Sequence, residues 1–202
     1  MIRELHLSPL WACSITASYV VFGLFGLLLF AQPPNYATTV FIPAGLAVLS
    51  TFLFGLWALP SIFIGSSILN CVVAFLPTYQ LCLAAFEAAL AIAAASSLQA
   101  ACGSHLFRRF MRFHDFRLIN YQNLATFTAL IPAVCLISAS LSIFALWWLD
   151  RLPVDQLLSN WLSWYIGDAF GMLVMLPWML LLYPLNEQEA RWAQDVLKGK
   201  IR

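Results

Sequence analysis

The sequence predicts an all-α, polytopic transmembrane helical bundle of six spans with both termini in the cytoplasm. Hydrophobic residues make up 62% of the 202 residues and charged residues only 9%, whereas a soluble domain is about 25% charged. Apolar runs of about 17 to 25 residues, long enough to cross a bilayer, follow one another with short gaps. Basic residues gather in connections that would share one side of the membrane.

Prolines separate the first three expected spans. Span one covers about 11–31 and ends before Pro33 and Pro34, which cannot continue a helix. Span two covers about 38–57 and span three about 61–77. The turn expected between them, Leu59-Pro60, is so short that the two helices must lie antiparallel beside each other.

A basic loop separates the fourth expected span from the fifth. Span four, about 81–103, is rich in alanine, which permits close helix approach in lipid. Spans five and six cover about 124–149 and 159–183. The loop between spans four and five either binds anionic headgroups or only fixes topology, through its arginines Arg108, Arg109, Arg112 and Arg117. Because basic loops stay in the cytoplasm, this loop places both termini there.

Span six carries the most informative residue of the chain, Asp168, at the centre of the run WLSWYIGDAFGMLVMLP. An aspartate at mid-span costs roughly 2.5 to 3.5 kcal/mol, so it implies a partner, a wet cavity or a proton, and by default a function. Gly167 and Gly171, which flank it, would let another backbone or a ligand approach this helix.

Three polar residues at similar depth in the membrane indicate a candidate ligand-binding site. Glu87 is the other acid inside a span, and Asn70 is the most notable amide. At about 1.5 Å per residue, both lie in the outer half, as Asp168 does. We expect the three to line one cavity that opens outward, with aromatic residues at its mouth: Trp161, Trp164 and Tyr165.

A structural explanation of the same polar residues stays open. Glu87 and Asp168, protonated by desolvation, would then only hydrogen-bond serines or backbone and fix helix packing. Asn70 would bridge two spans in the same way.

The sequence carries no catalytic motif among those searched. It has no phosphate-cradling GxxxxGK, no HExxH and no GxSxG. The net charge of +1 gives no reason to expect nucleic acid, and the scattered cysteines are expected to act as small buried hydrophobic residues. We therefore expect no enzyme activity, no cofactor and no metal.

Two segments together resemble the first MASE type of membrane-associated sensor domain, a bacterial input domain. One segment carries Pro43, Gly45, Gly55, Pro60, Gly65 and Asn70. The other carries Trp161, Trp164, Gly167, Asp168, Gly171 and Pro177. With Glu87 and the arginine loop also placed as in that family, the likeness covers roughly residues 35–185.

The resemblance implies a sensor in the bacterial inner membrane. Residues 1–185 would be the sensor domain and 186–202 a cytoplasmic polar tail. The implied output is a cytoplasmic diguanylate cyclase or phosphodiesterase of cyclic di-GMP signalling, or a histidine kinase of a two-component system. Family members usually have more spans and an output domain, so we expect a form truncated after six spans that acts on an output in cis or in trans.

A rival function is a membrane substrate-binding or transporter subunit for a small solute, and a packing partner in a larger complex is a third. Transporters often show repeats and broken helices. Here no repeat is evident and the only expected interruption is at Pro60, which favours the sensor. The expected partners are an unknown small ligand, the lipid bilayer, the output domain and a second copy in a homodimer, but no nucleic acid.

Overall fold

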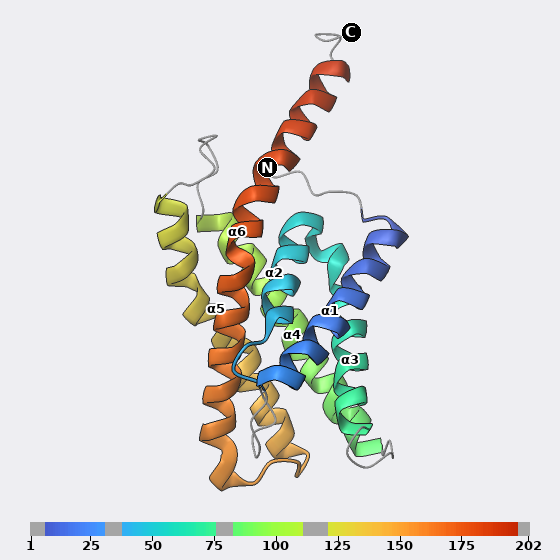
Figure 1. The fold of residues 1–202 in the computed structure, drawn as a ribbon, viewed down its shortest axis with the longest axis vertical. Helices are drawn as coiled ribbons and strands as arrows, with labels where there is room; N and C mark the ends of the chain where they lie inside the picture. The colour runs from blue at the N-terminus through green and yellow to red at the C-terminus, as the bar shows by residue number, and fades with distance from the viewer. Residues whose placement is uncertain (1–6, 31–37, 76–82, 111–120, 198–202) are drawn as a thin grey trace.

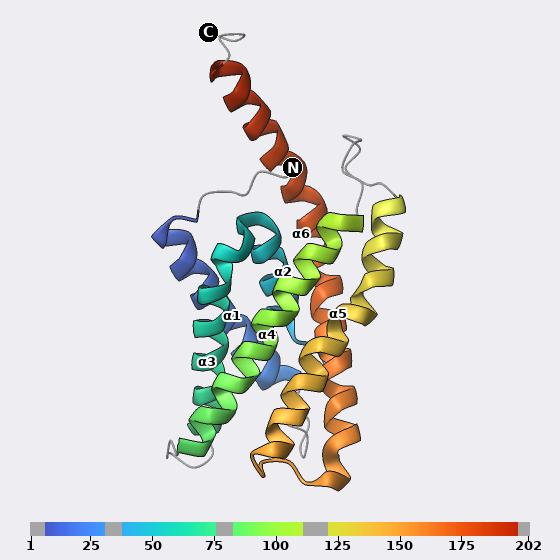
Figure 2. The same ribbon diagram turned by 180° about the vertical axis from the view of Figure 1, so that it is seen from behind.

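The computed structural model describes residues 7–30, 38–75, 83–110 and 121–197, which form one bundle of helices (Figures 1 and 2). Each of the six expected spans corresponds to one α helix. In chain order, these helices are α1 (Pro9–Phe30), α2 (Ile42–Phe54), α3 (Leu59–Phe75), α4 (Leu83–Phe110), α5 (Tyr121–Trp148) and α6 (Leu157–Leu197). Two short 3-10 turns, η1 (Gly55–Ala58) and η2 (Val154–Gln156), precede α3 and α6.

Helix α2 is the innermost element of the bundle. It packs against α6 on one side and α4 on the other, while α1 and α3 pair with each other and α5 packs on α4 and α6. Small residues such as Ala44, Gly45 and Ala47 let the neighbouring helices come close, and nearly the whole length of α2 is buried. The polar groups near its start are therefore enclosed by protein.

Helix α2 begins inside the bundle, so the expected full crossing over 38–57 is wrong. Its 13 residues extend about 20 Å, which is shorter than the roughly 30 Å hydrocarbon layer. The non-helical residues before it bond to other helices: the Phe41 N–H donates to the Gly167 carbonyl (3.0 Å), and the Thr38 hydroxyl donates to the Gly26 carbonyl (3.1 Å). Irregular backbone at this depth is tolerated only where protein surrounds it.

The chain reverses direction at η1 and not at Leu59-Pro60 (Figure 1). Gly55 has a φ of 70°, a conformation that glycine adopts without steric cost. Pro60 instead lies in the first turn of α3, where its missing N–H would have had no helical partner. After the reversal, α3 packs chiefly against α1 and α4.

The surface of the bundle is apolar, as contact with lipid requires. Among the described residues, four helical stretches have the length and composition to cross a membrane: Pro9–Phe30, Ile42–Phe75, Ala85–Phe110 and Leu124–Trp148. The second stretch contains both α2 and α3. Large hydrophobic side chains such as Leu10, Leu28 and Trp57 are more than half exposed, which is an unfavourable surface in water. These features indicate a multi-pass membrane protein.

Helix α6 is longer than the expected span 159–183. Its 41 residues extend about 60 Å, twice the thickness of the hydrocarbon layer. It continues without a break to Leu197, and its C-terminal part projects beyond the other helices (Figures 1 and 2). The expected boundary between residues 185 and 186 therefore lies within one continuous helix.

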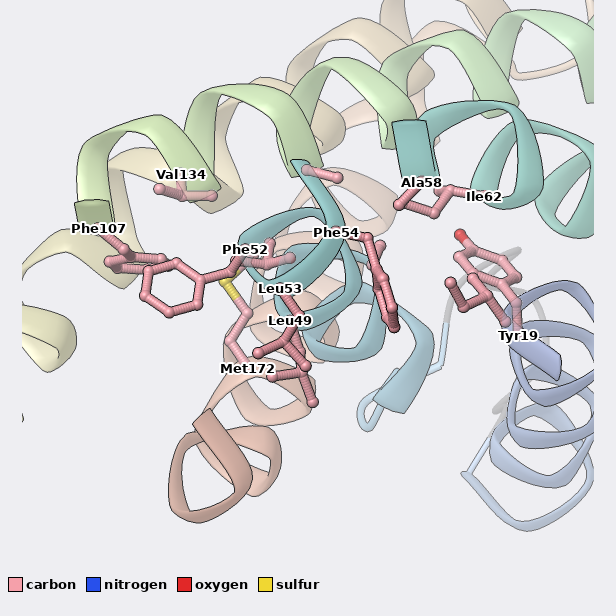
Figure 3. Packing of buried hydrophobic residues seen from close by; sticks show 14 of the residues in the cluster. Tyr19, Leu49, Phe52, Leu53, Phe54, Ala58, Ile62, Phe107, Val134 and Met172 are labelled. Carbon is pink, nitrogen blue, oxygen red and sulfur yellow. The ribbon is translucent and has the colours of Figure 1, made fainter. Parts of the chain in front are cut away.

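The main hydrophobic core surrounds α2 and joins all six helices. Figure 3 shows part of it, with Phe52 and Phe107 toward one end and Tyr19 and Ile62 toward the other. The Phe107 ring of α4 stacks on the Phe127 ring of α5, with centroids 4.3 Å apart. This packing fixes α4 and α5 next to the polar site described below.

Candidate functional site

Asp168 lies in the interior of the bundle and is held by neutral side chains from two other helices. It is 2% exposed. Its carboxyl group hydrogen-bonds with Gln99 of α4 and Ser138 of α5, and both of these residues are also 2% exposed. Buried polar groups are normally satisfied in this way, so the expense of placing an acid here is partly offset by the two bonds.

A second set of hydrogen-bonded polar side chains lies near Asp168, Gln99 and Ser138. The phenol of Tyr19, on α1, hydrogen-bonds with Ser66 of α3 and Ser96 of α4. Tyr19 and Ser66 are fully buried or nearly so. Together the two groups bring polar side chains of α1, α3, α4, α5 and α6 to one level of the bundle.

Two hollows adjoin these polar groups. The larger has a volume of about 40 Å³ and the smaller about 10 Å³, which correspond to space for about three water molecules and one. The larger is lined by Tyr19, Leu27, Thr38, Phe41, Ser66, Leu69, Asn70, Val73, Ile92, Ser96, Trp164 and Asp168. The smaller is lined by Tyr19, Phe41, Ala44, Ala47, Ser96, Gln99, Ser138 and Asp168.

The glycines that flank Asp168 admit the segment 38–41 to the site. A Cβ on Gly167 would meet the carbonyl oxygen of Thr38, and a Cβ on Gly171 would meet that of Phe41. The prediction that these glycines let another backbone approach is confirmed. Because Thr38 and Phe41 also line the larger hollow, this close approach forms part of its wall.

The structure brings together three of the six predicted ligand-binding residues. Asp168, Asn70 and Trp164 all line the larger hollow. The Asn70 amide also donates to the Ser66 carbonyl in its own helix, at 2.8 Å. Whether these residues bind a ligand remains a prediction.

The other three predicted residues lie elsewhere. Glu87 is exposed on α4 and lines neither hollow, so the expectation that it meets Asp168 is wrong. Trp161 and Tyr165 stack on each other, with ring centroids 5.3 Å apart, and the Trp161 indole donates to the Ser140 hydroxyl of α5. Neither residue lines either hollow.

Sequence reasoning missed most of the polar lining of the hollows, namely Tyr19, Thr38, Ser66, Ser96, Gln99 and Ser138. A signal for Gln99 was present, because an amide in the middle of an apolar run carries the same kind of expense as an acid. Ser96 lies three residues before it and thus on the same helical face. Single serines in membrane helices carry little information by themselves.

The part of the predicted arginine loop that the structure describes is helical, since Arg108 and Arg109 lie in the last turn of α4. Arg108 also has a structural role that the sequence did not indicate. The Arg108 guanidinium donates to the carbonyls of Thr51 (3.1 Å) and Phe52 (2.6 Å), at the C-terminal end of α2. Its guanidinium carbon also lies 5.7 Å from the Phe52 ring centroid. A cation there complements the helix dipole. Arg112 and Arg117 lie outside the described residues.

These features define a multi-pass membrane protein with a largely apolar hollow among its helices, bordered by Asp168. A family model, MASE1, matches residues 11–199. The chain therefore belongs to the MASE1 family of membrane-associated sensory domains, as the resemblance predicted. No curated protein and no solved structure matches the chain.

Proposed function

We propose that this chain is a sensory input domain that receives a small solute in the larger hollow and signals to a cytoplasmic output. Membership of a sensory family supports the general role. The observation that carries the specific proposal is Asp168, a buried acid with neutral partners that borders a hollow of about 40 Å³. Intramembrane acids by default indicate a functional site.

The topology in this proposal places both termini in the cytoplasm of a bacterium and the chain in its inner membrane. The start of α1 and the end of α6 lie at the same end of the bundle (Figure 1). Arg108 and Arg109 lie in the last turn of α4, at that same end, as expected for a cytoplasmic face.

Helix α6 is the proposed route of the signal. It contributes Asp168 and Trp164 to the hollow and continues beyond the bundle to Leu197. A solute that binds one arrangement of α6 relative to α4 more tightly than another shifts the population toward that arrangement. The C-terminal part of α6 moves with it and acts on a diguanylate cyclase, phosphodiesterase or histidine kinase, in cis or in trans, as a monomer or a homodimer. In this proposal the domain performs no catalysis itself.

A solute transporter subunit is the second candidate, and the start of α2 favours it. Discontinuous helices that begin near the middle of the bilayer are typical of transporter binding sites, and α2 begins beside Gly167. The two functions differ in outcome, because a transporter moves its solute into sealed vesicles and a sensor only binds it.

A solute screen tests the proposed function. We would measure the unfolding temperature of the purified chain in lipid nanodiscs with a library of small solutes, for the wild type, Asp168→Asn and Glu87→Gln. A ligand that binds the folded form at 100 times its Kd stabilises it by about 2.7 kcal/mol. We expect a solute that stabilises the wild type and Glu87→Gln but not Asp168→Asn.

Glu87→Gln is the matched control, since it also removes an intramembrane acid but at an exposed position outside both hollows. A library with no stabilising solute, or solutes that stabilise all three proteins equally, would contradict the proposed site. Accumulation of the solute inside sealed vesicles would show that the chain transports the solute, and the transporter function would then replace the sensor function.

A further inference from the structure

We infer that the solute of the larger hollow is a small organic cation, a primary ammonium on a short alkyl chain; this inference rests on the proposed function. Charge favours a cation in this hollow. Among the described residues, Asp168 is the only carboxylic acid that lines either hollow, and no Lys, Arg or His lines them. A buried carboxylate without a countercharge is costly, and an ammonium ion would provide that countercharge.

Part of the wall is aromatic. Rings of Tyr19, Phe41 and Trp164 line the larger hollow together with Asp168. The Tyr19 and Phe41 rings lie edge to face, with centroids 6.2 Å apart and planes at 80°. Aromatic faces attract ammonium groups, most strongly where water is excluded, so rings and carboxylate favour the same kind of ligand.

One hydrogen-bond acceptor beside Asp168 lacks a donor in the part of the chain that the structure describes. The Oε1 atom of Gln99 is buried and has no hydrogen-bond partner among the described residues. Gln99 lines the smaller hollow, which shares Tyr19, Phe41, Ser96 and Asp168 with the larger one. An unsatisfied buried acceptor costs about 1 to 3 kcal/mol. An ammonium bound at Asp168 has three N–H donors, enough to serve both groups, whereas an anion has none to offer.

The volume of the larger hollow and its apolar lining indicate what the ligand carries besides its ammonium group. Space for about three water molecules, at roughly 30 Å³ of liquid volume each, fits a molecule of about four heavy atoms. Leu27, Leu69, Val73 and Ile92 complete an apolar side that favours an alkyl chain over a polar one. The n-propylammonium ion has this size and character.

The experiment compares three probes of equal heavy-atom count and different charge: n-propylammonium, 1-propanol and acetate. Their affinities for the full chain in nanodiscs are measured by calorimetric titration at constant ionic strength. We expect n-propylammonium to bind the wild type and Glu87→Gln at least roughly tenfold more tightly than 1-propanol does. In Asp168→Asn this preference disappears, and acetate binds none of the proteins.

A second variant guards against misfolding of Asp168→Asn. Trp164→Leu keeps the carboxylate and removes one ring, and we expect it to weaken n-propylammonium severalfold while 1-propanol changes little. Equal affinity of the alcohol and the ammonium for the wild type, or an ammonium affinity unchanged in both variants, would overturn the inference. If the solute screen yields a neutral or anionic ligand whose binding depends on Asp168, the inferred positive charge of the ligand is wrong and the proposed function stands. If the screen yields no ligand, the proposed function is wrong as well.

Discussion

Asp168 and Glu87 are both intramembrane acids, yet their surroundings give them different energetic roles. Asp168 is bonded to Gln99 and Ser138 inside the bundle, so its removal leaves two buried polar groups without their partner. Glu87 is exposed, one turn beyond the first residue of α4. The free energy of unfolding should therefore depend on Asp168 and not on Glu87.

Leucine substitutions test this difference. We expect Asp168→Leu to lower the free energy of unfolding by about 2 kcal/mol or more, because each unsatisfied buried group costs about 1 to 3 kcal/mol. Glu87→Leu should leave it unchanged or raise it, since an apolar side chain then replaces a charge on the lipid-facing surface. Denaturant unfolding in lipid nanodiscs measures both values, and equal losses in the two variants would refute the assignment.

The contrast also shows what sequence can and cannot predict at this scale. The apolar context of Asp168 marked it as a costly residue, and depth counting placed Asn70 near it. Depth does not give the direction in which a side chain points, and this is why Glu87 was wrongly placed in the same hollow. On α4 the exposed face holds Glu87, Ala94 and Leu98, while Gln99 lies on the buried face.

At the scale of elements, the contact between α6 and the segment 38–41 organises the site. Gly167 and Gly171 were correctly predicted to permit close approach, but the sequence did not show that the approaching chain would be the start of α2. Composition made 38–57 look like a continuous span, because Phe41, Ile42 and their neighbours are as apolar as a helix that faces lipid. The break depends on long-range hydrogen bonds to Gly26 and Gly167, which no local pattern reveals.

Alanine substitution of one glycine tests the close approach. In Gly171→Ala the added methyl group meets the Phe41 carbonyl oxygen, a backbone atom that cannot move alone, so we expect a loss of about 1 to 3 kcal/mol in unfolding free energy. In the control, Gly23→Ala, the nearest atoms to the methyl group belong to the side chain of Leu69 and not to the backbone, so we expect a smaller loss. A loss in Gly171→Ala no greater than in Gly23→Ala would mean that α6 and the segment 38–41 do not touch as described.

For the whole molecule, α6 connects the two hollows to the end of the bundle. The larger hollow is lined by α1, α3, α4, α6 and the segment 38–41, and α2 and α5 contribute to the wall of the smaller one. Helix α6 extends from both to beyond the bundle. The all-helical membrane fold was predictable from composition and run lengths, and the family from twelve glycine, proline, tryptophan and polar positions. The hollows were not predictable in detail, because they result from the relative rotation of six helices.

Chemical labelling tests whether a small molecule can reach the hollow beside Asp168. Ser96→Cys places a thiol in the wall of both hollows, and Ser142→Cys places one at a fully buried position that lines neither. The neutral reagent methyl methanethiosulfonate is applied to each protein in nanodiscs, and mass spectrometry of the peptides measures labelling at each site. We predict that the cysteine at position 96 reacts and that the one at 142 does not. Failure of position 96 to react in the folded protein, or equal labelling of the two positions, would contradict the existence of an accessible hollow beside Asp168.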